Sequence, residues 1–340
     1  MKSTILTIAI PTFNRQPLLE TMLQLLVPLC ANSNLQILVI DNCSNDGTWE
    51  WLCSVKDKMG ITIEQNPFNF GIEGNIIQAL TRAKGKYIWL LSDHMNINVN
   101  EVNVFIEKLN SGLEFSFGYA CIDEYGTVLP EVYKPFTLGS ISRYSLGELL
   151  FFTGNISAFV INRKCLSQCI RTVFRFAAYS YPQLGVFAHA ACSDTFVELP
   201  QISNFKLELK PRGISYDTFR SRFIGFVRAL DEIVRLNPMF KHVHKALKTP
   251  RLIGALGYDA ILTLSFKTSR PVKPLEFAYC IRRYPGKIRI FLIGCLLLSM
   301  LPEKMKISTS RIFFRTFFTK YYDTALQDYK MRINPDTIRE

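Results

Sequence analysis

The sequence predicts an α/β protein in two parts. The first part, residues 1–204, is expected to form a mostly parallel β-sheet with helices on both faces, because short apolar runs alternate there with helical patterns. These runs lack polar alternation, which is typical of strands covered on both faces. Residues 205–340 are expected to be mainly helical and basic, since they contain 26 Lys and Arg against 11 Asp and Glu.

Composition limits the class of protein. The chain has 340 residues, of which 48% are hydrophobic, so it can bury a full core. Its nine cysteines include no C-x-x-C pair, so a reducing compartment fits better than a disulfide scaffold. The apolar start ends at Pro11 without a small-residue cleavage site, and no signal peptide is expected.

The predicted elements of the first part follow a strand–helix order. Strands are expected at residues 5–10, 35–41, 61–64 and 86–91. Helices are expected between them at residues 18–29, from Asp46 or Thr48 to about Met59, and at residues 71–84. A further helix is expected at residues 180–191. Asp46 or Thr48 is predicted to cap the second helix. This order predicts a parallel sheet in an α/β domain.

Polar residues collect where the predicted strands end. Thr12 and Asn14 follow the first strand, residues 41–46 follow the second, and Asp93 and His94 follow the fourth. Ligands of open α/β sheets bind outside the carboxyl ends of the strands. The sequence therefore predicts a binding site at this edge. The first turn has no G-x-G-x-x-G phosphate loop, which weighs against an NAD(P) oxidoreductase.

The basic second part predicts an anionic partner. Its net charge is +15, against −3 for residues 1–204. Ile290–Leu301 is an uncharged apolar run of 12 residues with basic residues before and after it, too short for the roughly 20 that span a bilayer. Arg311 and Arg315 would share one face of a following helix, and residues 252–266 are also apolar.

Short apolar helices bordered by cations are typical of helices that lie in the plane of an anionic membrane surface. Buried core helices of a second domain are the structural alternative. A nucleic-acid binder is a further alternative, although no recognisable binding module accompanies the charge.

Four ordered motifs resemble the family 2 glycosyltransferases, which have the GT-A fold. They are residues 10–15 (IPTFNR), residues 41–48 (DNCSNDGT), residues 66–75 (with NFG and GN) and residues 83–93 (AKGKYIWLLSD). The similarity is clearest over residues 4–96. Within the family it looks closest to enzymes of bacterial surface polysaccharide and O-antigen synthesis, such as abequosyltransferase-like proteins.

The resemblance implies an inverting transfer of a sugar from a nucleotide-diphosphate donor to a lipid-linked saccharide, such as one on undecaprenyl diphosphate. It implies a peripheral enzyme at the cytoplasmic face of the bacterial inner membrane, without a nucleic-acid partner. The implied donor-binding residues are Pro11, Thr12, Phe13, Asn14, Arg15, Asp41, Asn42, Ser44, Asn69, Gly71, Asn75 and Ser92. Asp41 also has a purely structural interpretation as a turn-capping residue.

The resemblance also implies a divalent cation, Mn²⁺ or Mg²⁺, which would stabilise the leaving diphosphate. The family uses a D-x-D type motif, but here Asp93 is followed by His94, so one carboxylate remains. We expect Asp93 and His94 to be the ligands, although His94 also fits a solvent-facing loop residue. Because of this departure, a catalytically impaired nucleotide-binding module with the same fold is the alternative function.

The general base for the acceptor hydroxyl is harder to assign. Between residues 154 and 200 the acidic candidates are Asp194 and Glu198, and Asp194 is the residue we select. His189 and the pair Asp123 and Glu124 are other candidates. A lone histidine on an apolar helix is more often packed than catalytic.

Overall fold

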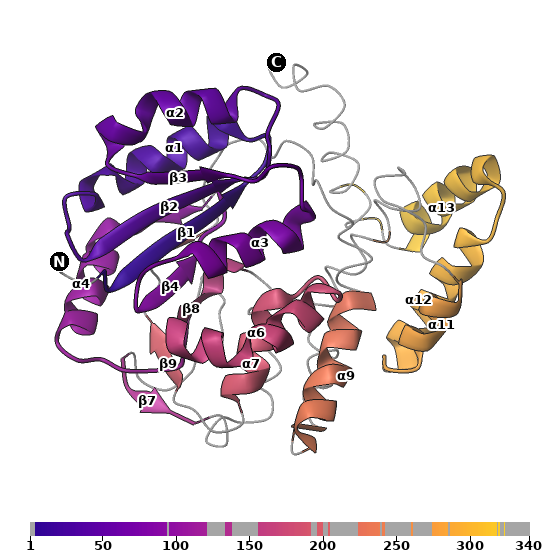
Figure 1. The fold of residues 1–340 in the computed structure, drawn as a ribbon. Coiled ribbons are helices and arrows are strands. Elements are labelled where there is room, and N and C mark those ends of the chain that lie inside the picture. Colours follow the sequence, from indigo (N-terminus) through magenta and orange to yellow (C-terminus); the bar gives the residue numbers. More distant parts are fainter. Residues whose placement is uncertain are drawn as a thin grey trace. The chain divides into compact units, whose positions relative to one another are not determined.

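The computed structural model describes residues 4–93, 95–120, 133–137, 156–191, 196–199, 203–204, 224–238, 240–241, 260, 274–284, 286–317, 319 and 323. The chain divides into two compact units, Met1–Glu208 and Leu209–Glu340. Figure 1 shows an α/β arrangement in the first unit and helices among the described residues of the second.

The first unit contains an eight-stranded sheet of mixed direction in the order β3-β2-β1-β4-β8-β6-β9-β7. The strands are β1 Leu6–Thr12, β2 Leu35–Asp41, β3 Thr62–Gln65, β4 Tyr87–Leu90, β6 Phe117–Ala120, β7 Pro135–Phe136, β8 Phe159–Asn162 and β9 Phe196–Leu199. The predicted α/β class is confirmed. The four predicted strands form the parallel half, β3-β2-β1-β4.

The other half of the sheet is mostly antiparallel, and the sequence patterns had not predicted its strands. β8 pairs antiparallel with both β4 and β6, β6 pairs parallel with β9, and β7 pairs antiparallel with β9. A separate short ladder joins β5 (Asn96–Ile97) to β10 (Ser203–Asn204). These strands have two to four residues.

Helices cover both faces of the sheet. In Figure 1, α1 (Gln16–Leu26) and α2 (Thr48–Met59) lie on one side, and α3 (Gly71–Arg82), α6 (Arg163–Ala177) and α7 (Pro182–Ala190) lie on the other. The 3₁₀ helix η1 (Val27–Leu29) extends α1, and α4 (Val99–Asn110) follows β5. The strand β1 is accordingly almost fully buried on both faces, which explains its continuous apolar run.

The start of α2 differs from the prediction in one residue. Its N-cap is Gly47, which has the left-handed φ of 91° that glycine adopts without a Cβ penalty. The two predicted cap residues flank Gly47 in the chain. The Asp46 carboxylate accepts a hydrogen bond from the Thr48 backbone N–H at 3.1 Å. Thr48 is the first residue of the helix. An acidic group thus still lies at the positive end of the helix.

The second unit has four described helices: α9 (Phe226–Leu236), α11 (Pro274–Ile281), α12 (Gly286–Ser299) and α13 (Glu303–Phe317). Asp231 of α9 accepts a hydrogen bond from the Tyr279 hydroxyl at 2.7 Å and pairs with Arg283 at 3.2 Å, so it joins α9 to the α11 segment. Among the described residues, no helix combines the length and the apolar character needed to cross a membrane. Residues 252–266, predicted to be apolar helix, lie outside the described residues apart from Ala260.

Candidate functional site

Three strands bring the predicted site residues to one edge of the sheet. β1 and β2 are in parallel register from Leu6 opposite Leu35 to Thr12 opposite Asp41, so both strands end together. β4 runs parallel on the other side of β1, and Asp93 follows its end by three residues. The carboxyl ends of neighbouring parallel strands thus place Thr12, Asp41 and Asp93 at the ligand-binding edge of an open α/β sheet.

Asp93 is held by two side chains from the β1 end. Its Oδ2 accepts a hydrogen bond from the Thr12 hydroxyl at 2.9 Å, and its Oδ1 accepts one from Arg15 Nη1 at 2.9 Å. Only 5% of the Asp93 side chain is exposed, against 20% for Arg15. Hydrogen bonds to ionised partners are stronger than neutral ones, and the ion pair offsets the cost of burying the carboxylate.

Two adjacent loops fix the position of Arg15. Asn14 has a left-handed φ of 53°, which turns the chain sharply before α1. The Asn14 backbone N–H donates to Ser44 Oγ at 2.8 Å, and its side-chain oxygen accepts from the Asn45 backbone N–H at 2.8 Å. The loop after β1 is therefore bonded to the loop after β2, and Arg15 extends from this double loop toward Asp93.

Asp41 is fully buried and acts as a brace in this structure. Its carboxylate accepts hydrogen bonds from the backbone N–H of Ser44 at 3.1 Å, from the Ser44 hydroxyl, and from Gln65 Nε2 at 2.9 Å. The geometry therefore matches the turn-capping interpretation of Asp41. Its contact with a donor, and that of Ser44, stay predictions.

A network of hydrogen-bonded asparagine side chains supports the same edge of the sheet. Asn66 Nδ2 donates to Asn42 Oδ1 and to Asn75 Oδ1, both at 2.9 Å, and Asn42 Nδ2 donates to Asn69 Oδ1 at 2.8 Å. Asn75 Nδ2 in turn donates to the carbonyl of Thr12 at 3.2 Å. Because buried amides need partners, this network fixes the loop before α3 against the ends of β1 and β2. A donor contact by Asn42, Asn69, Gly71 or Asn75 stays a prediction.

The side chains of this edge differ in accessibility. Asn42, Asn66 and Asn75 are buried, as are Thr12, Asp41 and Asp93. The predicted donor-binding residues that keep partial or full exposure are Pro11, Phe13, Asn14, Arg15, Ser44, Asn69, Gly71 and Ser92. The accessible rim is therefore separate from a buried, hydrogen-bonded layer that supports it.

Two supporting residues were missed by the sequence interpretation. Asn66 begins the third motif but had no role assigned, and its Oδ1 is buried without a hydrogen-bond partner among the described residues. Ser157 is fully buried; its Oγ accepts from the Ser92 N–H and its carbonyl accepts from Trp89 Nε1, both at 3.0 Å. Ser157 comes from a distant segment, so no local sequence signal connects it to Ser92.

Two predicted site residues, His94 and Asp194, lie outside the described residues, as do Asp123 and Glu124. The described part of the chain holds no group of three or more His, Cys, Asp and Glu side chains that would form a metal cage. Asp93 alone fits a different arrangement. Mg²⁺ is commonly held by one or two carboxylates together with substrate phosphates and water, so a single carboxylate fits a cation that arrives with a diphosphate.

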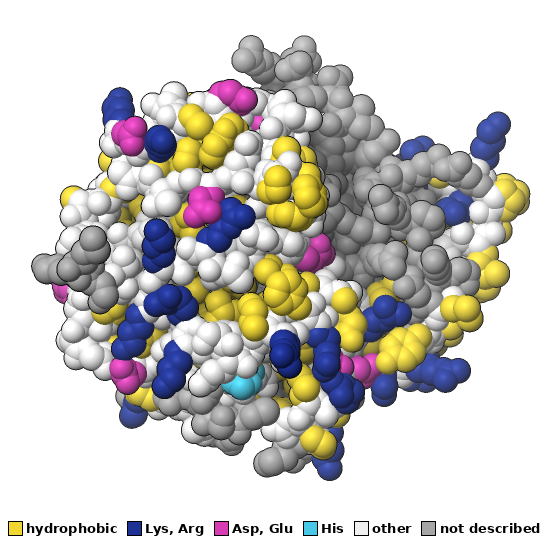
Figure 2. Space-filling model, in the orientation of Figure 1, with side chains coloured by type: hydrophobic (Ala, Val, Ile, Leu, Met, Phe, Trp, Pro, Cys, Tyr) yellow, Lys and Arg dark blue, Asp and Glu magenta, His cyan; other side chains and the backbone are white. Residues whose placement is uncertain are grey.

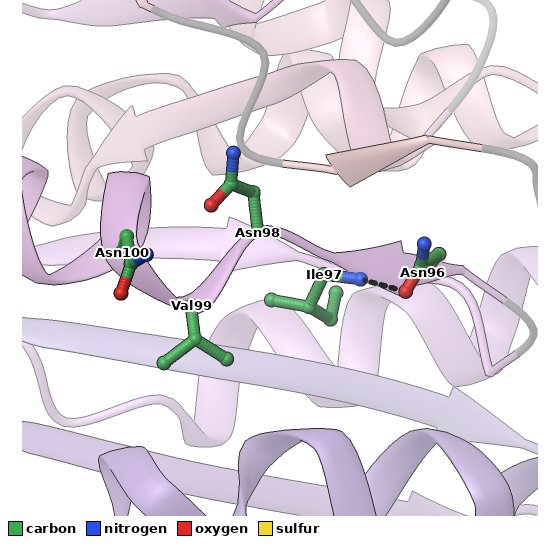
Figure 3. A pocket seen from close by; sticks show the side chains of 5 residues that line it. All are labelled: Asn96, Ile97, Asn98, Val99 and Asn100. Atoms are coloured by element: carbon green, nitrogen blue, oxygen red, sulfur yellow. Dashed lines mark hydrogen bonds between the residues drawn. The ribbon is translucent and has the colours of Figure 1, made fainter.

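An open pocket of about 350 Å³ lies at the start of α4. It is lined by Asn96, Ile97, Asn98, Val99 and Asn100. Asn98 caps α4 by accepting a hydrogen bond from the Glu101 N–H at 3.3 Å, and the Asn98 side chain points away from Val99 in Figure 3. The sequence interpretation did not single out this group of amides.

The strand order and the layers define the GT-A fold. The structure of residues 1–349 of TarS from S. aureus, solved in complex with UDP-GlcNAc, has the same fold, with a TM-score of 0.52. The similarity covers 96% of this chain and 92% of the TarS fragment at 14% sequence identity. At that identity the likeness concerns the fold alone.

Residues 7–151 match the model of glycosyl transferase family 2. A relative from Campylobacter jejuni, GalNAc(5)-diNAcBac-PP-undecaprenol beta-1,3-glucosyltransferase, is 28% identical over 129 residues, 37% of this chain and 41% of its own length. Abequosyltransferase RfbV of Salmonella typhimurium is 26% identical over 167 residues, 48% of each chain. The matched segments thus span less than half the length of these curated relatives.

Proposed function

We propose that the chain transfers a sugar from a nucleotide-diphosphate donor to a saccharide acceptor in bacterial surface polysaccharide synthesis, with inversion at the anomeric carbon. The observation that carries this is the group formed by Thr12, Arg15 and Asp93. A buried carboxylate and a partly exposed guanidinium stand together at the carboxyl edge of a GT-A sheet. UDP-GlcNAc is bound by the structurally similar TarS, which supports a nucleotide-sugar donor.

The donor side of the proposal uses the accessible rim. Arg15 presents a planar cation that suits phosphate oxygens, and phosphate is the part of the donor on which negative charge grows as the sugar leaves. The partly exposed ring of Phe13 offers an apolar face for the nucleotide base. Asn14, Ser44 and Asn69 supply polar groups for the ribose.

A divalent cation is part of the proposal, with Asp93 as its ligand in the described chain and His94 as the second predicted ligand. A bound cation would neutralise charge on the leaving diphosphate. Asp93 must then exchange a hydrogen bond for the cation, and Arg15, which is more exposed than Thr12, is the partner we expect to move. Thr12 holds the other oxygen and keeps the carboxylate oriented.

The general base remains the proposed Asp194. Its task is to take the proton from the acceptor hydroxyl as that oxygen attacks the anomeric carbon. An Asp194→Asn variant that retains donor binding but loses transfer would support the assignment. Unchanged transfer would move the role to another acidic residue.

The acceptor is proposed to be a saccharide on undecaprenyl diphosphate at the cytoplasmic face of the inner membrane. Two observations support this. The name of the C. jejuni relative specifies an undecaprenol-linked diphosphate substrate. The 26 Lys and Arg of residues 205–340 against 11 Asp and Glu suit an anionic membrane surface and the acceptor's own diphosphate.

A catalytically impaired nucleotide-binding module is the second candidate function. It is favoured by the single carboxylate at the metal motif, which already forms an ion pair with Arg15. The two functions differ in turnover: the enzyme cleaves the bond between sugar and diphosphate, whereas the module only binds the nucleotide.

The test measures thermal stability of detergent-purified protein with UDP, GDP, CDP and dTDP, each with and without Mn²⁺. A ligand at 100 times its dissociation constant adds about 2.7 kcal/mol to the free energy of unfolding, which is readily measured. The proposal expects one nucleotide to stabilise the protein, more strongly with Mn²⁺. The matching nucleotide sugars are then tested for hydrolysis, with Asp93→Asn as the control. Binding without any turnover would support the module, and no binding at all would contradict both functions.

A further inference from the structure

Helix α12 is apolar on two opposite faces. Ile288, Leu292, Cys295 and Leu298 are buried, at no more than 9% exposure. Four residues of the opposite face are exposed, namely Ile290 at 72%, Ile293 at 42%, Leu297 at 61% and Met300 at 64%. At 100° per residue, the exposed four fall within one narrow stripe that begins on α12 and continues to the turn after it.

The buried face accounts for the packing of α12 within its own unit. α12 contacts α11 and α13, and the rings of Phe291 and Phe314 lie 6.2 Å apart. Residues on the outer stripe contribute little to this packing because they are largely exposed. A helix that is apolar all round is ordinarily covered on all sides, so the outer stripe indicates a further apolar contact.

Basic residues lie beside the exposed apolar ones. Arg289 precedes the stripe and is exposed. On α13, Met305 and Ile312 are 56% and 69% exposed and share one helix face, since they are seven residues apart. Lys304, Arg311 and Arg315 are exposed along the flank of that face. Figure 2 shows hydrophobic and basic side chains together on the surface of α11 to α13.

We propose that the outer stripe of α12, Ile290, Ile293, Leu297 and Met300, inserts into the acyl boundary of an anionic lipid bilayer. The cations of α13 would meet the head groups, and this charge complementarity selects an anionic membrane as the occupant. With 14 residues α12 is about 21 Å long, less than the roughly 30 Å of a bilayer core, so it lies in the membrane plane. The inference rests on the proposed action at a lipid-linked acceptor and names the surface that reaches it.

The test is sedimentation of the full chain with vesicles. Detergent-free protein is mixed with vesicles of phosphatidylcholine alone or with 30% phosphatidylglycerol. The wild-type protein is expected to bind the anionic vesicles at least tenfold more tightly than the neutral ones. Ile293→Gln with Leu297→Gln is expected to lower binding to anionic vesicles at least tenfold, because both changes place amides in the acyl boundary. Lys304→Gln with Arg311→Gln and Arg315→Gln is expected to remove the preference for anionic vesicles.

The matched control is Val104→Gln with Phe174→Gln. Both residues are exposed helical hydrophobics of the first unit, at 40% and 56%, and this variant should bind vesicles like the wild type. Circular dichroism and melting temperature establish that each variant is folded. The inference would be overturned if the wild-type protein did not bind anionic vesicles, or if the α12 variant bound them as tightly as the wild type. If the wild type were a dimer and the α12 variant a monomer, the stripe would instead be the contact surface for a second copy of the chain.

Nucleotide binding separates this inference from the proposed function. The α12 variant should retain the thermal shift with UDP or another nucleotide in detergent, because none of its changes lies in the first unit. Vesicle binding without any nucleotide shift would leave the membrane surface supported and contradict the proposed function. A thermal shift with nucleotide but no vesicle binding would support the proposed function and contradict the membrane surface.

Discussion

Arg15 Nη1 lies 2.9 Å from Asp93 Oδ1, and these residues are 78 positions apart in the chain. The pair joins the loop after β1 to the loop after β4 at the predicted donor site. Because Asp93 is the carboxylate expected to hold a cation, its ion pair has two consequences. It neutralises a buried charge while no ligand is bound, and it sets a competition between the guanidinium and any metal ion.

Replacing Arg15 by Gln should separate these roles. Mn²⁺ binding without nucleotide, followed by electron paramagnetic resonance, should become tighter because Asp93 Oδ1 loses its competing cation. Nucleotide binding without metal should weaken about tenfold, or about 1.4 kcal/mol, because a phosphate partner is lost. Arg82→Gln is the control, since Arg82 forms a 2.9 Å ion pair with Glu64 rather than with Asp93. Weaker Mn²⁺ binding in Arg15→Gln would contradict the competition.

Replacing Asn75 by Ala should destabilise the first unit strongly. Asn75 accepts from Asn66 and donates to the carbonyls of Thr12 and Ile40, so its removal leaves several buried groups without partners. We expect a loss of about 2–4 kcal/mol in urea unfolding. Asn69→Ala is the comparison, because Asn69 is exposed and Asn42 Nδ2 keeps its hydrogen bond to the Gly71 carbonyl at 3.2 Å; a loss of about 0.5–1 kcal/mol is expected there. Equal losses would contradict the assignment of Asn75 to the supporting layer.

The N-cap of α4, beside the pocket, can be tested by its contribution to stability. Asn98 is the N-cap of that helix, and Asn98→Ala should lower the free energy of unfolding by about 1 kcal/mol. Asn100 lies in the first turn and is exposed, so Asn100→Ala should change stability by no more than about 0.5 kcal/mol. The reverse order in urea unfolding would show that the cap is not formed as described.

The link between α9 and α11 depends on pH. The hydrogen bond from Tyr279 to Asp231 raises the pKa of the phenol above its usual value of 10.0, while Arg283 acts in the opposite direction. For an acid with a raised pKa in the folded state, the stabilisation is present below pH 10 and disappears as pH rises through the raised pKa.

An absorbance titration of the wild type minus Tyr279→Phe isolates this phenol. The difference curve should have its midpoint above pH 10, and Asp231→Asn should move the midpoint down. A midpoint at or below 10 in the wild type would mean that the hydrogen bond is absent in solution.

The sequence by itself determined the parallel half of the sheet and the edge where the site forms. The strands β1, β2 and β4 are largely buried and appear as continuous apolar runs followed by polar residues, so strand ends and loops could both be recognised from local pattern. The difference in net charge between residues 1–204 and 205–340 also came from the sequence, because it requires only a count of charged residues. The family resemblance came from four motifs that are each local in the chain.

The tertiary structure decided what those residues touch. The ion pair of Arg15 with Asp93, the contact of Ser92 with Ser157 and the bonds of Asn75 to the carbonyls of Thr12 and Ile40 connect residues 35 to 78 positions apart. No local pattern encodes such pairings. The strands of the other half of the sheet, β6 to β9, were missed because their pairing partners lie far apart in the chain and only the folded sheet brings them together. In α12 every position is apolar over most of its length, so only packing against α11 and α13 could decide which apolar face is buried and which stays exposed.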